Sequence, residues 1–300
     1  MSKIKLVEPD LRSVAKPDHL PLHRLQYESV VRGALEEDLG RAGDLTTDGV
    51  VEMDTMARGE LSARKAGVVA GLDIAATAFT MLDPNVTLVA DRPDGSHVAA
   101  GERIALVEGS ARALLSGERT ALNLLSRLCG IATSTARMVA ATAGHKAHII
   151  CTRKTTPGLR TLEKYAVRVG GGMNHRFGLD DAVLIKDNHV AIAGGITEAV
   201  TRVRRRAGHM VKIQVEVDTL DQLELLLPLG VDAVMLDNMD PDTMRRAVSL
   251  VNGRMLVEAS GGITPETVAR VAATGVDLIS SGALTHSVKA LDIGLDFQMG

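Results

Sequence analysis

The second half of the chain alternates short apolar runs with segments of helical spacing, and this alternation constrains the fold more than any other feature of the sequence. The apolar runs, rich in Val, Ile and Leu, lie at residues 148–151, 183–185, 213–217, 233–236, 255–257 and 278–279. Helical segments lie between them, including residues 191–206, 220–229, 242–251 and 265–274. Strands of this composition that alternate with helices predict parallel βα units buried on both faces.

Polar or reactive residues follow each apolar run. These groups are 152–154 (TRK), 186–188 (KDN), Asp218, 237–238 (DN), Glu258 with 260–262 (SGG), and 280–282 (SSG). In a closed (β/α) barrel such strand ends converge on one mouth, whereas in an open doubly wound sheet they spread along an edge. The six or seven units are fewer than the eight of a full barrel, which leaves an incomplete barrel and an open sheet as alternatives. The concentration of charge at the strand ends favours the barrel.

The first half has a different pattern. Residues 1–23 carry Pro9, Pro17 and Pro21 without sustained periodicity, which indicates an irregular arm. The spacing predicts a helix over 25–39 that ends at Gly40, and then an α+β unit with strands at 59–63, 67–70, 86–90 and 104–107 around a helix at 73–82. A long helical stretch follows at 111–143, with a break expected near Gly130.

Composition excludes several classes of protein. The 34 basic and 37 acidic residues leave a net charge of −3, and aromatic residues make up 2% with no Trp, so the stacking platforms of nucleic-acid-binding modules are lacking. No apolar run approaches the ~18 residues of a membrane span, and the N-terminus lacks the apolar core of a signal peptide. The two cysteines, Cys129 and Cys151, form neither a disulfide framework nor a CxxC pair. We therefore expect a cytoplasmic protein with no nucleic-acid or membrane partner.

Cationic residues are concentrated near the strand ends of the predicted barrel. They are Arg153, Lys154, His175, Arg176 and Lys186. Gathered at one mouth, they would repel one another unless acids or bound anions neutralise them, which indicates a polyanionic small ligand. The alternative is that they are solvated surface residues or partners of carboxylates.

The segment 260–266 (SGGITPE) predicts a phosphate site. Gly261 and Gly262 expose backbone N–H groups, and Thr264 is placed to cap a helix that begins at Pro265. Ser281 and Gly282 would close the other side, although a plain capped turn would also explain the segment. The chain has neither the GxGxxG fingerprint of a dinucleotide site nor a GxxxxGK[ST] phosphate loop.

Two carboxylates stand in neighbouring predicted strands. Glu216 and Asp237 are oxygen ligands of the kind that Mg²⁺ takes alongside substrate phosphates, and they also suit ribose hydroxyl groups. A salt bridge from either carboxylate to Lys186 or Arg153 is the structural alternative.

Four motifs, together and in this order, resemble the quinolinate phosphoribosyltransferase family: 118–123 (ERTALN), 152–158 (TRKTTPG), 170–176 (GGGMNHR) and 184–189 (LIKDNH). The resemblance implies an α/β fold, with an N-terminal α/β sandwich joined to an incomplete, about seven-stranded α/β barrel. It also implies a homodimer whose sites lie at the subunit contact. We accordingly expect a first domain at 1–122, with residues 288–300 packing back on it, and a barrel domain at 123–287.

The resemblance further implies conversion of quinolinate and phosphoribosyl pyrophosphate to nicotinate mononucleotide, pyrophosphate and carbon dioxide, with Mg²⁺. The catalytic set that it implies is Lys154, Lys186, Glu216 and Asp237, with the last two holding ribose hydroxyls and, directly or through water, the metal. The other residues implied in substrate binding are Arg153, His175 and Arg176 for the quinolinate carboxylates, Arg119 donated to the partner's site, Thr152, and Ser260, Gly261, Gly262, Ser281 and Gly282 around the 5′-phosphate.

Three other functions remain open on the residues alone. One is a related barrel transferase for nicotinate or another aromatic acid, which would release no carbon dioxide. Another is a Schiff-base aldolase with Lys154 or Lys186 as nucleophile, which borohydride would trap. The third is a non-catalytic phospholigand-binding barrel, because a fold alone does not establish a function.

Overall fold

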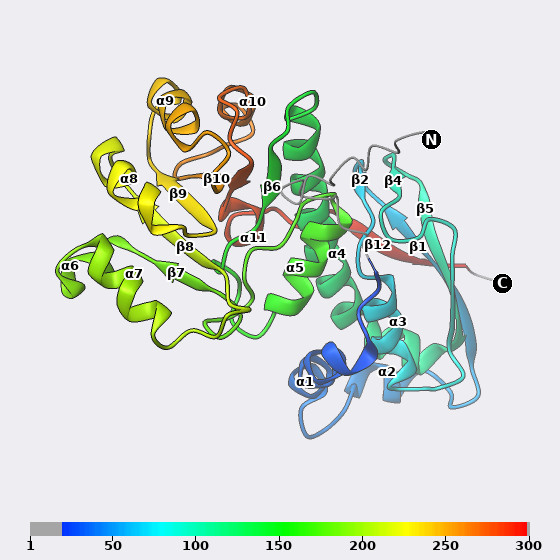
Figure 1. Ribbon diagram of the computed structural model, residues 1–300. Coiled ribbons are helices and arrows are strands. Elements are labelled where there is room, and N and C mark those ends of the chain that lie inside the picture. The colour runs from blue at the N-terminus through cyan, green and yellow to red at the C-terminus, as the bar shows by residue number, and fades with distance from the viewer. Residues whose placement is uncertain (1–19, 299–300) are drawn as a thin grey trace, which may run out of the picture.

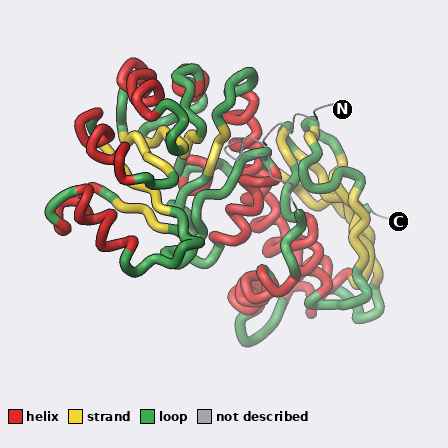
Figure 2. Tube along the Cα trace, viewed as in Figure 1, coloured by secondary structure: helices red, strands yellow, loops and turns green. Residues whose placement is uncertain are grey.

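The structure is a computed structural model that describes residues 20–298. A parallel β-sheet lies on one side of the long helix α4 (Ala111–Ala141), and an antiparallel sheet lies on the other side. Figures 1 and 2 show further helices packed against the parallel sheet. Most of the irregular arm expected at 1–23 lies outside the described residues, and residues 20–23 form neither helix nor strand. Within residues 20–298, no helix is both long and apolar enough to cross a membrane.

The parallel sheet has six strands in the order β6-β11-β10-β9-β8-β7. Their bounds are β6 His148–Ile150, β7 Val183–Ile185, β8 Ile213–Val217, β9 Ala233–Asp237, β10 Leu256–Ser260 and β11 Leu278–Ser280. An isolated parallel bridge between Ile150 and Met173 extends the pairing beyond β6. The expected α/β fold, with a barrel and a separate N-terminal sheet, is confirmed.

Helices connect the strands of this barrel: α5 (Arg160–Val169), α6 (Asp187–Ala193), α7 (Ile196–Arg204), α8 (Leu220–Leu226) with the 3-10 turn η2 (Leu227–Leu229), α9 (Pro241–Val251), α10 (Val268–Ala272) and α11 (Ala283–His286). The single helix expected at 191–206 is instead the pair α6 and α7. Gly194 and Gly195 separate them, with φ of 89° and 140° that a helix interior does not allow.

The N-terminal part is built on an antiparallel sheet of order β12-β1-β5-β3. Its strands are β1 (Met56–Ala63), β3 (Thr87–Ala90), β5 (Arg103–Ser110) and β12 (Ile293–Phe297). A separate two-stranded antiparallel sheet pairs β2 (Gly67–Val68) with β4 (His97–Val98). A 3-10 turn η1 (Arg24–Gln26) and the helices α1 (Glu28–Leu39), α2 (Leu45–Val50) and α3 (Leu72–Thr80) complete it. Strand β12 pairs with β1, so Phe297 lies opposite Gly59.

Helix α4 is continuous, so the break expected near Gly130 is wrong. A Cβ atom at Gly130 would lie 2.3 Å from the carbonyl oxygen of Lys289. The glycine therefore serves the close approach of the chain that leads into β12, and it does not end the helix. Buried side chains along α4 face the helices and strands on both sides of it.

Asp94 ties the N-terminal part to the barrel. Its carboxylate accepts hydrogen bonds from the backbone N–H of Gly71 at 2.7 Å, at the start of α3, and from the hydroxyl of Tyr165 in α5 at 2.6 Å. Burial and the nearby Asp94 charge both raise the pKa of Tyr165. The phenol is thus held in its protonated, donating form across the contact.

Substituting Gly130 tests the packing of α4. We expect Gly130→Ala to lower the free energy of unfolding by about 2 kcal/mol, because the added methyl group displaces backbone that cannot move freely. In α1, a Cβ added at Gly33 would meet no atom within 4 Å. Gly33→Ala should raise stability by about 0.5 to 1 kcal/mol through helix propensity. Urea denaturation of both variants measures the difference, and equal stabilisation by both would contradict this account of Gly130.

Candidate active site

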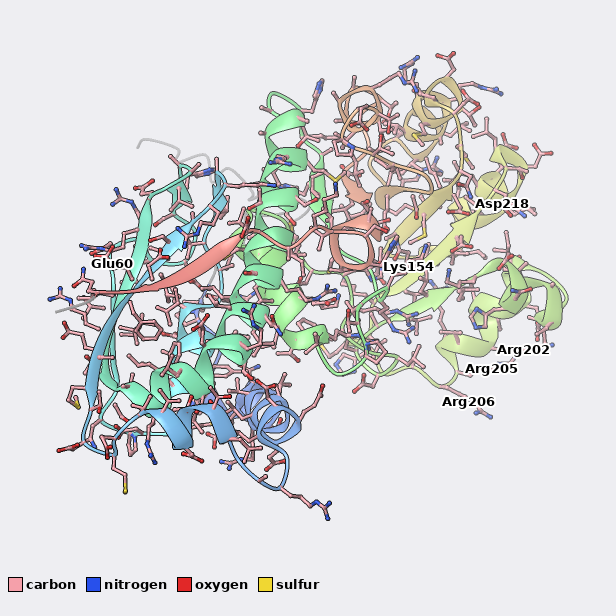
Figure 3. All side chains as sticks on the ribbon, turned by 180° about the vertical axis from the view of Figure 1, so that it is seen from behind. Glu60, Lys154, Arg202, Arg205, Arg206 and Asp218 are labelled. Carbon is pink, nitrogen blue, oxygen red and sulfur yellow. The ribbon has the colours of Figure 1, made fainter. Side chains whose placement is uncertain are left out.

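A cavity of about 750 Å³ lies at the carboxyl ends of the parallel strands. Every site residue expected from the sequence lines it except Arg119. The side chains or backbones brought together there are Thr152, Arg153, Lys154, His175, Arg176, Lys186, Glu216, Asp237, Ser260, Gly261, Gly262, Ser281 and Gly282. Asp218 also follows a strand but does not line the cavity. Figure 3 labels this residue near the periphery of the molecule.

Arg176 is partly buried, whereas Arg153, Lys154 and Lys186 in the same cavity are exposed. Nη1 of Arg176 donates a hydrogen bond to the carbonyl of Ala182 at 2.8 Å. Burial, and then repulsion from Arg153, lower its pKa, although an arginine remains charged at neutral pH. A bound anion between Arg153 and Arg176 would relieve both effects, so this wall of the cavity favours a carboxylate or phosphate ligand.

Lys186 and Glu216 form an ion pair across neighbouring strand ends, with 2.9 Å between Nζ and Oε2. The salt-bridge alternative therefore describes Glu216 in the ligand-free protein. Asp237 accepts a hydrogen bond from the side-chain amide of Asn238 at 2.7 Å, and no ion pair of Asp237 occurs within residues 20–298. Two carboxylates, one of them without a cationic partner in that range, remain available to ligand hydroxyls or a metal.

The backbone around Lys154 is fixed by side chains from α4, α5 and α11. Arg127 of α4 pairs with the fully buried Glu163 of α5, and Glu163 accepts a hydrogen bond from the backbone N–H of Thr156 at 3.1 Å. The hydroxyl of Thr285 donates to the carbonyl of Lys154 at 2.7 Å. Figure 3 shows Lys154 on the barrel side of α4, with Glu60 on the opposite sheet.

The glycine loop after β10 lies directly against the loop after β9. Gly261 and Gly262 have φ of 96° and 60°, and a Cβ at Gly261 would lie 2.1 Å from Oδ1 of Asn238. Only glycine fits Gly261 in this conformation. The backbone at this point therefore presents its amides without side-chain obstruction.

The helix expected to begin at Pro265 with Thr264 as its cap begins later. Residues 265–267 form a turn, and α10 starts at Val268 with Thr267 as its N-cap residue. The side chain of Thr267 accepts a hydrogen bond from the backbone N–H of Thr264, which consumes one amide of the turn. A phosphate site at this loop depends on the glycine backbone and not on a helix N-terminus.

Both ring nitrogens of His175 have hydrogen-bond partners within the protein. Its Nδ1 accepts a hydrogen bond from the backbone N–H of Arg176 at 2.8 Å, and its Nε2 lies 2.8 Å from Oε1 of Gln214. The amide of Gln214 donates to the buried Glu258 at 2.7 Å. These side chains extend into the barrel toward a second cavity of about 560 Å³ at the amino ends of the strands.

Two further positions concern the edge of the site. Arg119 is exposed in α4 and does not line its own chain's cavity, as its expected donation to a partner's site requires, and that donation stays a prediction. His286 of α11 lines the cavity but belongs to no motif, and the only signal for it is its place one helical turn after Gly282. His189 caps the start of α6, because its Nδ1 accepts a hydrogen bond from the backbone N–H of Lys186 at 2.9 Å.

Comparison with known proteins gives consistent matches along the chain. The N-terminal domain of quinolinate phosphoribosyl transferase matches residues 44–129, and its C-terminal domain matches residues 131–296. The chain is 47% identical over 275 residues to a probable nicotinate-nucleotide pyrophosphorylase (carboxylating) of Bacillus subtilis, covering 92% of this chain and 94% of that relative. It is 43% identical to the chloroplastic nicotinate-nucleotide pyrophosphorylase (carboxylating) of Oryza sativa, covering 94% and 80% respectively. The structure of NadC from Streptococcus pyogenes superposes with a TM-score of 0.89 at 40% identity, covering 93% of this chain and 100% of that one.

Substitution of Gly261 tests the contact between the two loops. Gly101 also has a left-handed φ, of 82°, but its added Cβ would meet no atom within 4 Å. Gly101→Ala should therefore lower the free energy of unfolding by about 1 kcal/mol through backbone strain alone. Gly261→Ala adds a clash with Asn238 and should lower it by about 2 to 4 kcal/mol. Urea denaturation compares the two variants. An equal loss of unfolding free energy in both would show that the contact with Asn238 does not restrict residue 261.

Proposed function

The chain belongs to the quinolinate phosphoribosyltransferase family, and we propose that it transfers the phosphoribosyl group of phosphoribosyl pyrophosphate to quinolinate, with release of pyrophosphate and carbon dioxide. The observation that carries this proposal is the single cavity that joins a cationic wall to a glycine loop and two carboxylates. A reaction between two acidic small molecules needs both halves of such a cavity.

Quinolinate would occupy the cationic wall. It is a dianion at neutral pH, and the partly desolvated Arg176 beside Arg153 supplies the fixed positive charge that two carboxylates need. Lys186 pairs with Glu216 and would exchange part of that contact for a substrate carboxylate. In this arrangement the substrate's carboxylates would attract Arg153 and Arg176, which otherwise repel each other.

Phosphoribosyl pyrophosphate would occupy the other half. The amides of Gly261 and Gly262, with Ser281 and Gly282 opposite, suit its 5′-phosphate. Glu216 and Asp237 are placed to accept hydrogen bonds from ribose hydroxyl groups. Lys154, whose side chain lies beside Gly282, would contact the phosphoribosyl group and share in binding quinolinate.

The chemistry requires positioning more than acid–base catalysis. The pyridine nitrogen forms a bond to the sugar C1 as the bond from C1 to pyrophosphate breaks, and the two nearby carboxylates tolerate the positive charge that develops on the sugar. The ring nitrogen is then cationic, so it stabilises the electron pair that stays on the ring carbon when the bond to the 2-carboxylate breaks and carbon dioxide departs. The ring carbon takes a proton, for which the ammonium groups of Lys154 and Lys186 are the candidate donors. Effective molarity alone can supply ~7 to 11 kcal/mol.

Magnesium fits the donor set but would share it with substrate. Mg²⁺ prefers one or two carboxylates together with substrate phosphates and water, and Glu216 and Asp237 provide such a pair. Residues 20–298 hold no group of three or more potential ligands, so the protein by itself makes no closed cage there. Bound with pyrophosphate, the ion would neutralise the leaving group.

We also propose a homodimer in the cytoplasm. The exposed Arg119 lies outside its own chain's cavity, which suits donation to a neighbouring subunit's site. Both cysteines are free and buried, and burial raises the pKa of Cys129 to about 12. Such thiols are compatible with a reducing compartment.

An assay with quinolinate, phosphoribosyl pyrophosphate and Mg²⁺ tests the function, read by nicotinate mononucleotide and released carbon dioxide. We expect Arg176→Ala to raise the KM for quinolinate at least about tenfold, because a charge-assisted hydrogen bond contributes about 1.5 to 3 kcal/mol. The KM for phosphoribosyl pyrophosphate should change less. Arg205→Ala, at an arginine outside the cavity, is the control. Turnover of nicotinate in place of quinolinate, without carbon dioxide, would instead identify a transferase for another acid. An unchanged quinolinate KM would refute the role of Arg176.

Subunit mixing tests the donation of Arg119. Arg119→Ala and Lys186→Ala should each be nearly inactive alone. After joint unfolding and refolding, a mixed dimer would hold one site with both groups intact, and random mixing should restore about a quarter of the wild-type rate. The absence of any recovery, with mixed dimers shown by mass spectrometry of differently tagged chains, would rule out a shared site.

A further inference from the structure

A layer of three polar side chains crosses the interior of the barrel. His175 and Glu258 line both the cavity at the carboxyl ends of the strands and the cavity at their amino ends, and Gln214 lies between them. Glu258 and Gln214 are 1% and 8% exposed, so their polar groups depend on one another and not on solvent. The layer stands directly behind the cationic wall of the active site.

The hydrogen bonds in this layer run in one direction. The carboxylate of Glu258 only accepts, so the NH₂ group of Gln214 faces it and the oxygen of Gln214 faces His175. That oxygen also only accepts, so Nε2 of His175 must carry the proton. The backbone N–H of Arg176 occupies Nδ1, which therefore carries none. The imidazole is the neutral Nε2–H tautomer, even though Nε2 lies 3.6 Å from Glu258.

Both ring nitrogens are thus engaged by the protein. The nitrogen at Nδ1 holds the backbone of Arg176, whose guanidinium is held separately by the carbonyl of Ala182. Gln214 holds the His175 ring at Nε2. The ring in turn fixes the position of the Arg176 backbone through the hydrogen bond at Nδ1. The direction of Arg176 into the cavity follows from that backbone position.

We propose that Gln214 and Glu258 are positioning residues that hold His175 as the neutral Nε2–H tautomer, and that His175 in turn places Arg176. The kinetic part of this inference rests on the proposed function. The tautomer part rests on the protein alone.

The energetics of Glu258 support a role beyond stability. Its Oε1 has no hydrogen-bond partner within the described residues, and no arginine or lysine there forms an ion pair with it. A buried carboxylate satisfied at one oxygen is costly, and an apolar residue of similar size would avoid that cost. The carboxylate is the group that orients the amide of Gln214, which a leucine would not do.

The first experiment determines the tautomer without substrate. Long-range ¹⁵N–¹H spectra of the full chain at pH 7.5 show the protonation of each histidine ring, and loss of a signal in His175→Gln assigns it. We expect a neutral ring with the proton on Nε2. An imidazolium, or a proton on Nδ1, would overturn the proposal whatever the activity of the protein.

The second experiment removes both partners while keeping the volume nearly constant. The double variant Gln214→Leu/Glu258→Leu should shift the backbone amide signal of Arg176 and raise the KM for quinolinate about tenfold, with the KM for phosphoribosyl pyrophosphate and kcat each changed less than about threefold. Thr274→Val is the control, because it removes a buried hydrogen bond of 2.7 Å from the Thr274 hydroxyl, outside the cavity.

The outcomes separate the two proposals. Absence of turnover by the wild-type protein would refute the proposed function, while the tautomer and the Arg176 signal would still decide the positioning role. A double variant that behaves like Thr274→Val in both readouts would overturn that role. If the double variant does not fold, the tautomer measured in the wild-type chain remains decisive.

Discussion

Parallel pairing of the barrel strands is the constraint on which the rest of the structure depends. It places the end of every strand at one edge, so residues more than a hundred positions apart in sequence meet in one cavity. The cations of that cavity repel one another, and burial together with repulsion from Arg153 lowers the pKa of Arg176. Only a well-braced scaffold keeps such charges together before a ligand arrives.

The bracing comes from outside the barrel as much as from within it. The ion pair of Arg127 with Glu163 secures the loop of Lys154, and the side chains behind His175 secure Arg176. Helix α4 contributes Arg127 to the barrel while it also packs on the N-terminal sheet. Residues from α4 and from the barrel therefore both hold the cavity's side chains in place.

The sequence predicted the barrel strands and their reactive ends because both signals are local: an apolar run and the residues that follow it. It failed where a residue's role is set by a distant partner. Gly130 suggests a helix break in the sequence, but a glycine is needed there because the carbonyl oxygen of Lys289 packs against the helix. Helix α10 begins at Val268 and not at Pro265, after a turn over residues 265–267 that the capping pattern does not reveal. His286 and the neutral state of His175 depend on contacts that no local pattern records.

The pairing of β12 with β1 has a consequence for how the chain folds as it is synthesised. Residues 56–63 emerge from the ribosome early, but residues 293–297, which cover one edge of β1, emerge more than two hundred residues later. Until then β1 has only β5 as a partner and presents an open edge of unpaired backbone groups. The nascent N-terminal sheet is therefore a point of vulnerability to aggregation, and its completion must await the barrel.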